Sequence, residues 1–388
     1  MTYVPPKKFK KIAILSNGFG EDQIACNLIQ ALWKVDPSAE IVACPLVGEG
    51  KEYEAIGITP IFQNKPFPSG GFLRQAKPVL KDLQQGLVKH HLSQLKHLKT
   101  HKDEVELCLV IGDVFGLIMA KLAGIGPRFF IPTAKSDLFM PHSLLERFLI
   151  KKYAKKVYTR DQLTATNLSK KGVPATYLGN AMMDHLSVTD SPFQFSKEDY
   201  VISIVPGSRE EAYENTLLCF KLANDLFKEN DSYTFILAKA QSIDLIRLKN
   251  LLSENGWKLV YQKPHLCFHQ QQSKQSISIS DNFTDAISPS TAVIGLAGTA
   301  NEQAVYLGKQ VICFEGAGPQ SSKVRFEEQS QLLGEKLHFI PERNHHKRVN
   351  HIHTLLTEWK GLQEMSKHIP KAGPRIVTDL LETLYKVS

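Results

Sequence analysis

The stretch Lys11-Ile-Ala-Ile-Leu-Ser-Asn-Gly-Phe-Gly-Glu-Asp22 decides the class of fold. It begins with an apolar run typical of a buried strand, continues through a turn with two glycines, and leads into 24–35, where apolar residues recur at helical spacing. Continuous apolar strands that alternate with helices favour a parallel sheet covered on both faces. In this half of the chain we expect further strands at 40–45, 58–62, 106–112, 127–132 and 156–159, and a helix at 115–122.

The same pattern restarts after residues 185–199, which lack clear periodicity and are interpreted as a linker. Strands are expected at 200–205, 232–238, 257–261, 292–296 and 310–314, helices at 211–227, 242–254 and from 301, and a mostly helical tail at 349–387. The sequence therefore predicts two α/β domains, 1–184 and 200–388, that face each other across a cleft. We expect the last helices to pack back on the N-terminal domain. Ligands of such sheets bind beyond the carboxyl ends of the strands.

Composition narrows the kinds of partner. The chain has 388 residues, 43% of them hydrophobic, which excludes disorder as a global description. Its net charge of +8 is uneven, because 1–190 carry 25 basic and 17 acidic side chains whereas 191–388 carry 22 of each. This asymmetry indicates a polyanionic partner for the first half: a nucleic acid, an anionic membrane surface or a phosphorylated substrate.

The sequence shows no pattern for secretion or for crossing a membrane. The apolar stretch after the first lysines is only Ile12–Leu15, and the longest apolar run, 107–120, is interrupted by Asp113. The six cysteines are scattered without a C-x-x-C pair and are interpreted as reduced core thiols. We therefore expect a cytoplasmic protein.

The strongest local motif is Val205-Pro-Gly-Ser-Arg209, between a predicted strand and a predicted helix. Gly207 permits a tight turn, Ser208 can cap the helix, and Arg209 offers a bidentate donor to a pyrophosphate. A helix N-terminus also favours an anion. An ordinary strand-to-helix turn with a capping serine and a surface arginine remains an equal alternative.

A second strand-to-helix turn reads Ala297-Gly-Thr-Ala-Asn-Glu302. Gly298, Thr299 and Ala300 place small residues where a ligand can approach the backbone. Glu302 stands in the first helical turn, where a carboxylate can accept both hydroxyls of a ribose. Its alternative role is that of an acidic residue that stabilises a helix start.

Three motifs lie in or beside the first half. Gly18 and Gly20 suit a loop that lets a ligand approach a helix end, without the G-x-G-x-x-G pattern of a dinucleotide site. Asp113 follows a strand, where catalytic acids and bases often occur, although a helix cap is its more common role. Gly179 and Asn180 lie between the halves and are expected to form the hinge-side wall of the cleft, or else a plain interdomain turn.

Taken in order, these five motifs resemble the lipid A disaccharide synthase family and its synthase-related branch, over about residues 11–330. They resemble more distantly the peptidoglycan glycosyltransferase that acts on lipid I. The resemblance implies a GT-B fold of two Rossmann-like domains, with a UDP-sugar on the C-terminal domain and the acceptor on the N-terminal one. It implies inverting transfer without a bound metal or cofactor. The residues implied as catalytic are Asp113, Glu21 and Asp22, and those implied as nucleotide-sugar-binding are Gly207, Ser208, Arg209, Gly298, Thr299, Ala300, Glu302, Gly18, Gly20 and Asn180.

Two departures from the family pattern lie on the acceptor side. The first motif reads Asn17-Gly-Phe-Gly-Glu-Asp22 instead of Gly-Glu-x-Ser-Gly-Asp, and the family's Ser-Pro-x-x-Trp-Ala-Trp segment is absent after the strand at 127–132. The donor motifs agree better, so the sequence favours a nucleotide-sugar glycosyltransferase over a lipid A synthase in particular.

The segment 65–102 has eight basic residues and one acidic residue, with leucines at helical spacing. We expect this basic amphipathic segment to lie on an anionic membrane surface, where a lipid-linked acceptor is reached. The alternative is a core-facing leucine stripe with a solvated basic face. Its histidines have no accompanying acid or cysteine cluster and are interpreted as solvated.

Three functions remain open at this point. The first is transfer of a sugar, an N-acetylhexosamine or an acylated derivative, from a UDP-sugar to a lipid-linked acceptor, peripherally at the cytoplasmic membrane face. The second is a UDP-sugar epimerase of the same fold. The third is a non-catalytic binding protein, either a degenerate transferase or a nucleic-acid binder. No RNA-binding or helix-turn-helix signature supports nucleic acid.

Overall fold

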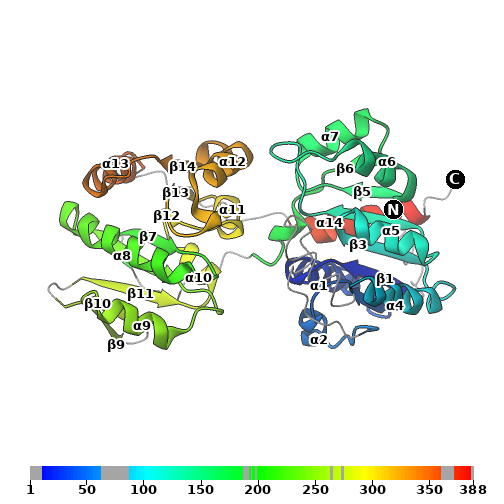
Figure 1. Ribbon diagram of the computed structural model, residues 1–388, viewed down its shortest axis with the longest axis horizontal. Coiled ribbons are helices and arrows are strands. Elements are labelled where there is room, and N and C mark those ends of the chain that lie inside the picture. Colours follow the sequence, from blue (N-terminus) through cyan, green and yellow to red (C-terminus); the bar gives the residue numbers. More distant parts are fainter. Residues whose placement is uncertain are drawn as a thin grey trace, which may run out of the picture. The chain divides into compact units, whose positions relative to one another are not determined.

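The computed structural model describes residues 11–62, 87–186, 192–193, 195–196, 199–262, 265–271, 275–359 and 371–385. The chain divides into two compact units (Figure 1). Unit 1 is Met1–His185 with Pro370–Ser388, and unit 2 is Leu186–Ile369. Each unit contains one sheet flanked by helices, and parallel pairing predominates in both sheets. The prediction of two parallel-sheet α/β domains is confirmed.

Unit 1 has a six-stranded sheet with the order β2-β1-β3-β4-β5-β6, parallel throughout. Its strands are β1 (Lys11–Ser16), β2 (Glu40–Pro45), β3 (Leu107–Gly112), β4 (Arg128–Pro132), β5 (Lys156–Tyr158) and β6 (Ala175–Thr176). Its helices are α1 (Phe19–Val35), α2 (Lys51–Ala55), α4 (Leu87–Thr100), α5 (Val114–Leu122), α6 (Leu144–Tyr153), α7 (Gln162–Lys170), the short η1 (Ala181–Met183) and α14 (Ala372–Tyr385).

The strand predicted at 58–62 is wrong. Ile58 does bury its side chain in the core, and the Ile61 N–H donates to the Ala43 carbonyl. The intervening Pro60 has no N–H for a ladder, so the segment makes a single backbone bond to β2 and forms no strand.

Alternate residues of β1 enter two different cores, because side chains of a strand point to opposite faces. Ile12 and Ile14 pack with side chains of α1 and α14, whereas Ala13 and Leu15 pack with side chains of α5, α6 and α7. Burial on both faces explains why the strands of this sheet read as continuous apolar runs.

The last helix, α14, packs in unit 1 although it follows unit 2 in the chain (Figure 1). The buried Asp184 carboxylate accepts the N–H groups of Ala372 and Gly373 at its start. Further along the helix, Asp379 accepts from the Tyr158 hydroxyl at 2.9 Å and pairs with Lys156. These polar contacts join α14 to the chain's first unit.

Unit 2 has an eight-stranded sheet with the order β14-β13-β12-β7-β8-β11-β10-β9. Its strands are β7 (Tyr200–Val205), β8 (Tyr233–Ala238), β9 (Trp257–Gln262), β10 (His265–Gln270), β11 (Ser276–Ser280), β12 (Ala292–Gly295), β13 (Gln310–Phe314) and β14 (Leu337–Ile340). Its helices are α8 (Ala212–Glu229), α9 (Leu245–Ser253), α10 (Phe283–Ile287), α11 (Thr299–Tyr306), α12 (Lys323–Leu333) and α13 (His345–Glu358), with short turns η2 (Pro319–Ser321) and η3 (Gly334–Lys336). The pairs β9–β10 and β10–β11 are antiparallel, which the sequence analysis did not predict.

All six cysteines are buried and none forms a disulfide. Within the described ranges, no helix combines the length and the apolar character that crossing a bilayer requires.

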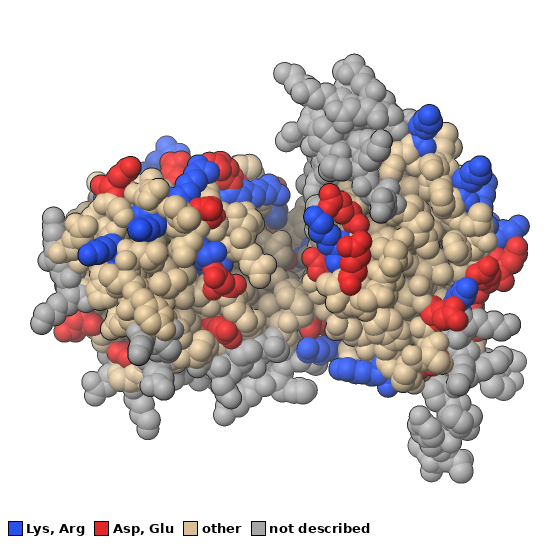
Figure 2. Space-filling model, turned by 90° about the horizontal axis from the view of Figure 1, so that it is seen from below, with Lys and Arg blue, Asp and Glu red and all other residues tan. Residues whose placement is uncertain are grey.

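The basic segment 65–102 is described only from residue 87 onward. There, Leu95 and Leu98 of α4 pack against the core of unit 1, and the buried Gln94 amide donates to the Leu46 carbonyl. Among the leucines 92, 95 and 98 of α4, Leu92 is the exception and is 60% exposed. In this part of the segment the leucine stripe therefore faces the core, as the alternative interpretation held, instead of a membrane. On the face that Figure 2 shows, basic and acidic side chains are interspersed.

Replacing Asp184 tests how the C-terminal helix is held. In Asp184→Ala, two buried N–H groups lose their acceptor, which costs about 3 kcal/mol of unfolding free energy. Urea unfolding followed by circular dichroism measures this loss. Asp231→Ala, at an exposed turn, is the control and should stay within about 0.5 kcal/mol of the wild type. Equal stability of the two variants would contradict this account of α14.

Candidate functional site

The order in which strands are added to the sheet of unit 2 reverses at β7. The chain adds β8 on one side of β7 and later places β12 on its other side, so a switch point lies between β7 and β12. Ligands of open α/β sheets bind outside the carboxyl ends of the strands at such points. The two predicted donor motifs follow these two strands, and the Leu296 N–H donates to the Val205 carbonyl at 2.9 Å between them. The fold thus brings the motifs together across about 90 residues of sequence.

Gly207 and Gly298 lie where the loops after β7 and β12 turn. Gly207 has a φ of +109°, which side-chain-bearing residues rarely adopt, and a Cβ there would lie 3.6 Å from the Leu296 carbonyl oxygen. A Cβ on Gly298 would lie 2.8 Å from Oε1 of Gln320, in the loop after β13. Three loops therefore converge at the switch point, from β7, β12 and β13.

Two helices begin at this switch point without a capping side chain. The N-cap residue of α8 is Glu211, whose side chain accepts no hydrogen bond from the helix, and that of α11 is Gly298, which has no side chain. Ser208, expected as the cap, lies ahead of the helix start and does not fill that role. Elsewhere in unit 2, α9, α12 and α13 are capped by Asp244, Ser322 and Asn344. In α8 the Ala212 and Tyr213 N–H groups already donate to the carbonyls of Arg209 and Glu210. The aligned helix dipoles and the first N–H groups of α11, at Thr299 and Ala300, are therefore what favours an anionic ligand here.

Buried amides support these loops, and sequence reasoning missed them. The Asn215 amide donates to the carbonyls of Pro206 and Ala317 and its oxygen accepts the Ala317 N–H. Ser321 donates to the Leu296 carbonyl, and Gln329 donates to the Gly298 carbonyl at 3.0 Å. Both amide side chains are at most 1% exposed. The Gly-rich stretch 316–320 after β13 was the available signal for this third loop.

The predicted donor residues differ in accessibility. Ser208 and Arg209 are exposed, so a ligand at the switch point can reach them. Thr299 and Ala300 form the first turn of α11. Glu302 is only 7% exposed, so the ribose contact expected of it has little room in this structure.

Unit 1 has an equivalent switch point between β1 and β3, because β2 flanks β1 on its other side. Asp113 follows β3, and the Asn17 side chain that follows β1 hydrogen-bonds to its carboxylate. Gly112 permits this contact with a φ of +128°, since a Cβ there would lie 2.8 Å from Cβ of Asn17. The two strand ends are thereby joined side chain to side chain.

Thr133, at the end of β4, extends the group of polar residues. Its N–H donates to the Gly112 carbonyl, and its hydroxyl donates to Oε1 of Glu21 at 2.8 Å. The Arg160 guanidinium donates to the Thr133 carbonyl at 3.0 Å. Four strand ends thus contribute to one edge, those of β1, β3, β4 and β5.

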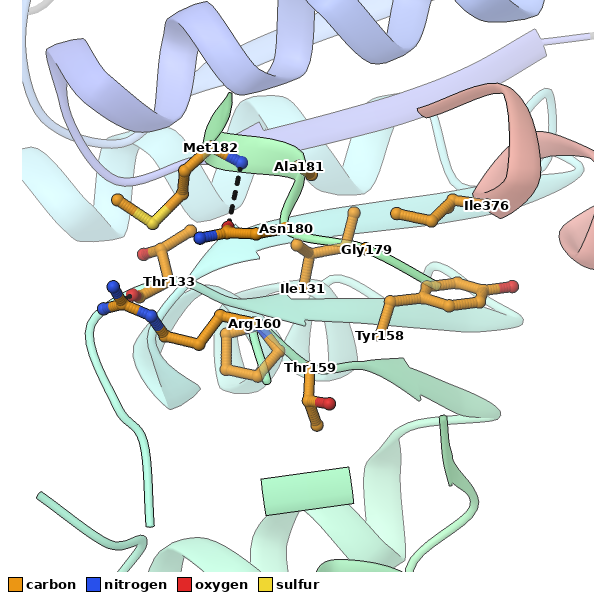
Figure 3. A pocket seen from close by; sticks show the side chains of 11 residues that line it. Ile131, Thr133, Tyr158, Thr159, Arg160, Gly179, Asn180, Ala181, Met182 and Ile376 are labelled. Carbon is orange, nitrogen blue, oxygen red and sulfur yellow. Dashed lines mark hydrogen bonds between the residues drawn. The ribbon is translucent and has the colours of Figure 1, made fainter. Parts of the chain in front are cut away.

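A small pocket opens at this edge (Figure 3). Thr133, Arg160 and Met182 lie around it, and the Asn180 side chain turns back to accept the Met182 N–H at 3.1 Å. Asn180 is therefore placed in the wall of a pocket of unit 1, where it caps η1. Apolar side chains such as Ile131 and Ile376 complete the lining.

Asp113 has two roles that were posed as alternatives. It caps α5 by accepting the Phe115 N–H at 2.8 Å, and it remains exposed at the strand end. Desolvation by the surrounding protein raises the pKa of the Asp113 carboxyl. Hydrogen bonds from the Phe115 N–H and the Asn17 side chain act in the opposite direction and lower it. A raised pKa brings a carboxylate nearer to the range useful for general base catalysis.

Asp22 does not reach the surface. Its side chain is 0% exposed, its Oδ1 accepts the Ser16 hydroxyl at 2.5 Å, and Ser16 is 2.7 Å from the Tyr53 hydroxyl. Desolvation raises the pKa of Asp22 to about 7. A fully buried carboxyl cannot contact substrate. The catalytic role predicted for Asp22 is therefore corrected to a supporting one, in which its carboxylate holds the Ser16 hydroxyl at the end of β1.

Gly18 and Gly20 stand at the start of α1, which lacks a capping side chain, whereas α5, α6 and α7 are capped by Asp113, Ser143 and Asp161. Gly18 has an extended backbone, and its Cβ would lie 3.3 Å from the Glu21 carboxylate. Gly20 is exposed inside the first helical turn, with nothing within 4 Å of its Cβ position. The start of α1 thus has no capping side chain, and the ligand-facing role of Gly18 and Gly20 stays a prediction.

Across the described residues, no group of three or more His, Cys, Asp and Glu side chains is placed to hold a metal ion.

No family model and no curated protein sequence matches the chain. Solved structures do match. UDP-GlcNAc 2-epimerase from Neisseria meningitidis bound to UDP-GlcNAc is 15% identical, with a TM-score of 0.60 over 97% of this chain and 100% of that one. MnaA of S. aureus, solved with UDP, is 14% identical, with a TM-score of 0.60 over 97% and 98%. MurG of Acinetobacter baumannii is 12% identical, with a TM-score of 0.54 over 97% and 100%. The chain therefore shares the two-domain fold of GT-B type UDP-sugar enzymes; the lipid A disaccharide synthase resemblance is not among these findings.

Burial of Asp22 predicts a specific pH dependence. Because its pKa is about 7 in the folded chain and near 3.9 when unfolded, the folded state binds the proton more tightly between these values. This contribution to stability is present at low pH and is lost as pH rises to about 7, by as much as roughly 4 kcal/mol. Asp22→Asn removes this pH-dependent contribution, so the unfolding free energy of the variant minus that of the wild type, measured in urea, should become more positive from pH 4 to pH 8 as the wild type loses stability. A difference independent of pH would contradict the assignment.

Proposed function

We propose that this protein is an inverting glycosyltransferase that takes a sugar from a UDP-sugar bound on unit 2. The observation that carries the proposal is the convergence of Pro206–Arg209 and Gly298–Ala300 at one switch point, where α8 and α11 both begin uncapped. The shared fold of UDP-sugar enzymes supports the choice of nucleotide.

In this proposal the uncapped helix starts bind the diphosphate of the donor. The aligned dipoles of both helices and the first N–H groups of α11 favour negative charge, and the exposed Arg209 adds two charge-assisted hydrogen bonds. The same groups stabilise the charge that develops on UDP as it leaves, so the reaction needs no resident metal or cofactor. The nearly closed environment of Glu302 makes backbone groups of 298–300 the better candidates for the ribose side.

The proposed general base is Asp113 of unit 1. It lies exposed at a strand end, and Asn17 and the Phe115 N–H hold its carboxylate in place. It would take the proton of an acceptor hydroxyl as the oxygen attacks the anomeric carbon and the bond to UDP breaks. Glu21, fixed by Thr133, lies on the same edge and is proposed to orient the acceptor.

The acceptor is proposed to be lipid-linked and the transferred sugar an N-acetylhexosamine or an acylated derivative. Both statements come from the resemblance to lipid A disaccharide synthases, which is carried by the donor motifs. Contact with an anionic membrane at the cytoplasmic face belongs to the same proposal.

The second candidate function is epimerisation of a UDP-sugar. One of the solved structures named above favours it, because it is a UDP-GlcNAc 2-epimerase bound to UDP-GlcNAc. An epimerase would isomerise a UDP-sugar without any acceptor. A transferase would release UDP only when an acceptor is present.

The donor site is tested by UDP titration calorimetry. Arg209→Ala should weaken UDP binding about tenfold to a hundredfold, because a hydrogen-bonded charge contributes roughly 1.5–3 kcal/mol. Lys221→Ala removes an exposed cation further along α8 and should bind UDP like the wild type. Unchanged affinity in Arg209→Ala would refute the assignment of this site.

The reaction itself is tested with Asp113→Asn, since asparagine can still cap α5 but cannot accept a proton. UDP release from UDP-GlcNAc should require a bacterial lipid extract, and the variant should lower kcat by about 10²–10⁴ while it keeps the wild-type affinity for UDP. Conversion of UDP-GlcNAc to its C2 epimer without lipid would instead establish the second candidate. Full activity of Asp113→Asn in either reaction would remove Asp113 from the mechanism.

A further inference from the structure

The outer face of α6 in unit 1 exposes large apolar side chains. Leu144, Leu145 and Phe148 are 79%, 67% and 58% exposed. Positions i, i+1 and i+4 of a helix share one side, and Ile150 on the other side is fully buried in the core. Apolar side chains gathered in this way mark an interaction surface, unlike single exposed leucines.

Lysines follow the apolar turn, on α6 and directly after it. Lys151, Lys152 and Lys155 are exposed, and the Lys152 ammonium lies 5.5 Å from the centre of the Phe148 ring. Residues 142–172 contain eight basic and two acidic side chains, and among the basic ones Lys156 pairs with Asp379. Glu146 pairs with Lys135 at 2.8 Å and Asp161 caps α7. The apolar turn of α6 is therefore bordered by an excess of positive charge.

We infer that this face of α6 is a docking surface for an anionic lipid bilayer. Leu144, Leu145 and Phe148 enter the boundary between headgroups and acyl chains, and the lysines meet lipid phosphates. The long lysine stems allow the ammonium groups to reach the headgroups beside the inserted ring. Against a second copy of this chain, the same face would bring lysines to lysines, which disfavours that occupant.

The surface lies at the edge of unit 1 that carries the candidate site. The chain leaves the carboxyl end of β4 at Thr133 and begins α6 at Leu144, and the Lys135–Glu146 pair ties the intervening loop to the helix. Docking through α6 would hold the strand ends near Glu21 close to the bilayer. The inference deepens the membrane contact of the proposed function, and the exposure and charge of α6 carry it.

Vesicle co-sedimentation of the full chain tests the inference. The wild type should bind vesicles of phosphatidylcholine mixed with phosphatidylglycerol, bind pure phosphatidylcholine much less, and be released by salt. Leu144→Gln with Leu145→Gln and Phe148→Gln should lower the partition coefficient by at least about tenfold. Lys151→Glu with Lys152→Glu should lower it by a similar factor. Ile246→Gln, which changes a 71% exposed side chain on α9 of unit 2, should bind like the wild type.

Three results would overturn the inference. They are absence of binding by the wild type, equal binding by the triple glutamine variant, and a wild-type dimer that this variant converts to a monomer without any vesicle binding. Circular dichroism and urea unfolding of each variant check that it is folded. UDP titration separates the two proposals, because vesicle binding by the folded wild type without UDP binding would refute the donor site and leave the membrane surface standing.

Discussion

The candidate nucleotide site depends on one constraint, the pairing of β7 with β12 at the point where the strand order of unit 2 reverses. That pairing ends in the bond from the Leu296 N–H to the Val205 carbonyl, and beyond it the two segments continue into α8 and α11. Because β7 and β12 are neighbours in the sheet, the starts of α8 and α11 lie at the same edge of it. Buried amides of Asn215 and Gln329 satisfy carbonyls of these loops, so the loop conformation does not depend on a ligand.

Capping divides the helices of both units into two classes. Most begin with an aspartate, asparagine or serine that satisfies the first N–H groups, whereas α1, α2, α8 and α11 begin at glycine or at an unengaged glutamate. Three of these four, α1, α8 and α11, follow β1, β7 and β12, the strands at the two switch points, and α2 follows the edge strand β2. A missing cap lowers helix stability by about 1 kcal/mol, so its recurrence at the switch points is consistent with a ligand that supplies the missing acceptor.

The sequence predicted the strands that are buried on both faces, because continuous apolar runs are distinctive; 200–205 and 310–314 agree with β7 and β13 to the residue. It predicted β9 to within one residue but neither β10 nor β11, although serine and isoleucine alternate along β11. Motif reasoning placed Arg209 and Gly298 correctly at strand ends, but it could not see that Asp22 and Glu302 are buried, since burial depends on residues distant in sequence. The supporting Asn215 and Gln329 lie inside helices, where no local pattern separates them from surface amides.

Hydrogen exchange with and without UDP tests the central claim most directly, since the proposed ligands are largely backbone N–H groups. The account predicts that UDP slows amide exchange in peptides that cover Gly207–Arg209 and Gly298–Ala300. It predicts unchanged exchange at Asn17–Asp22, which belongs to the proposed acceptor edge. Protection by UDP at unit 1 alone, or no protection at either loop of unit 2, would contradict the claim that the switch point of unit 2 binds the nucleotide.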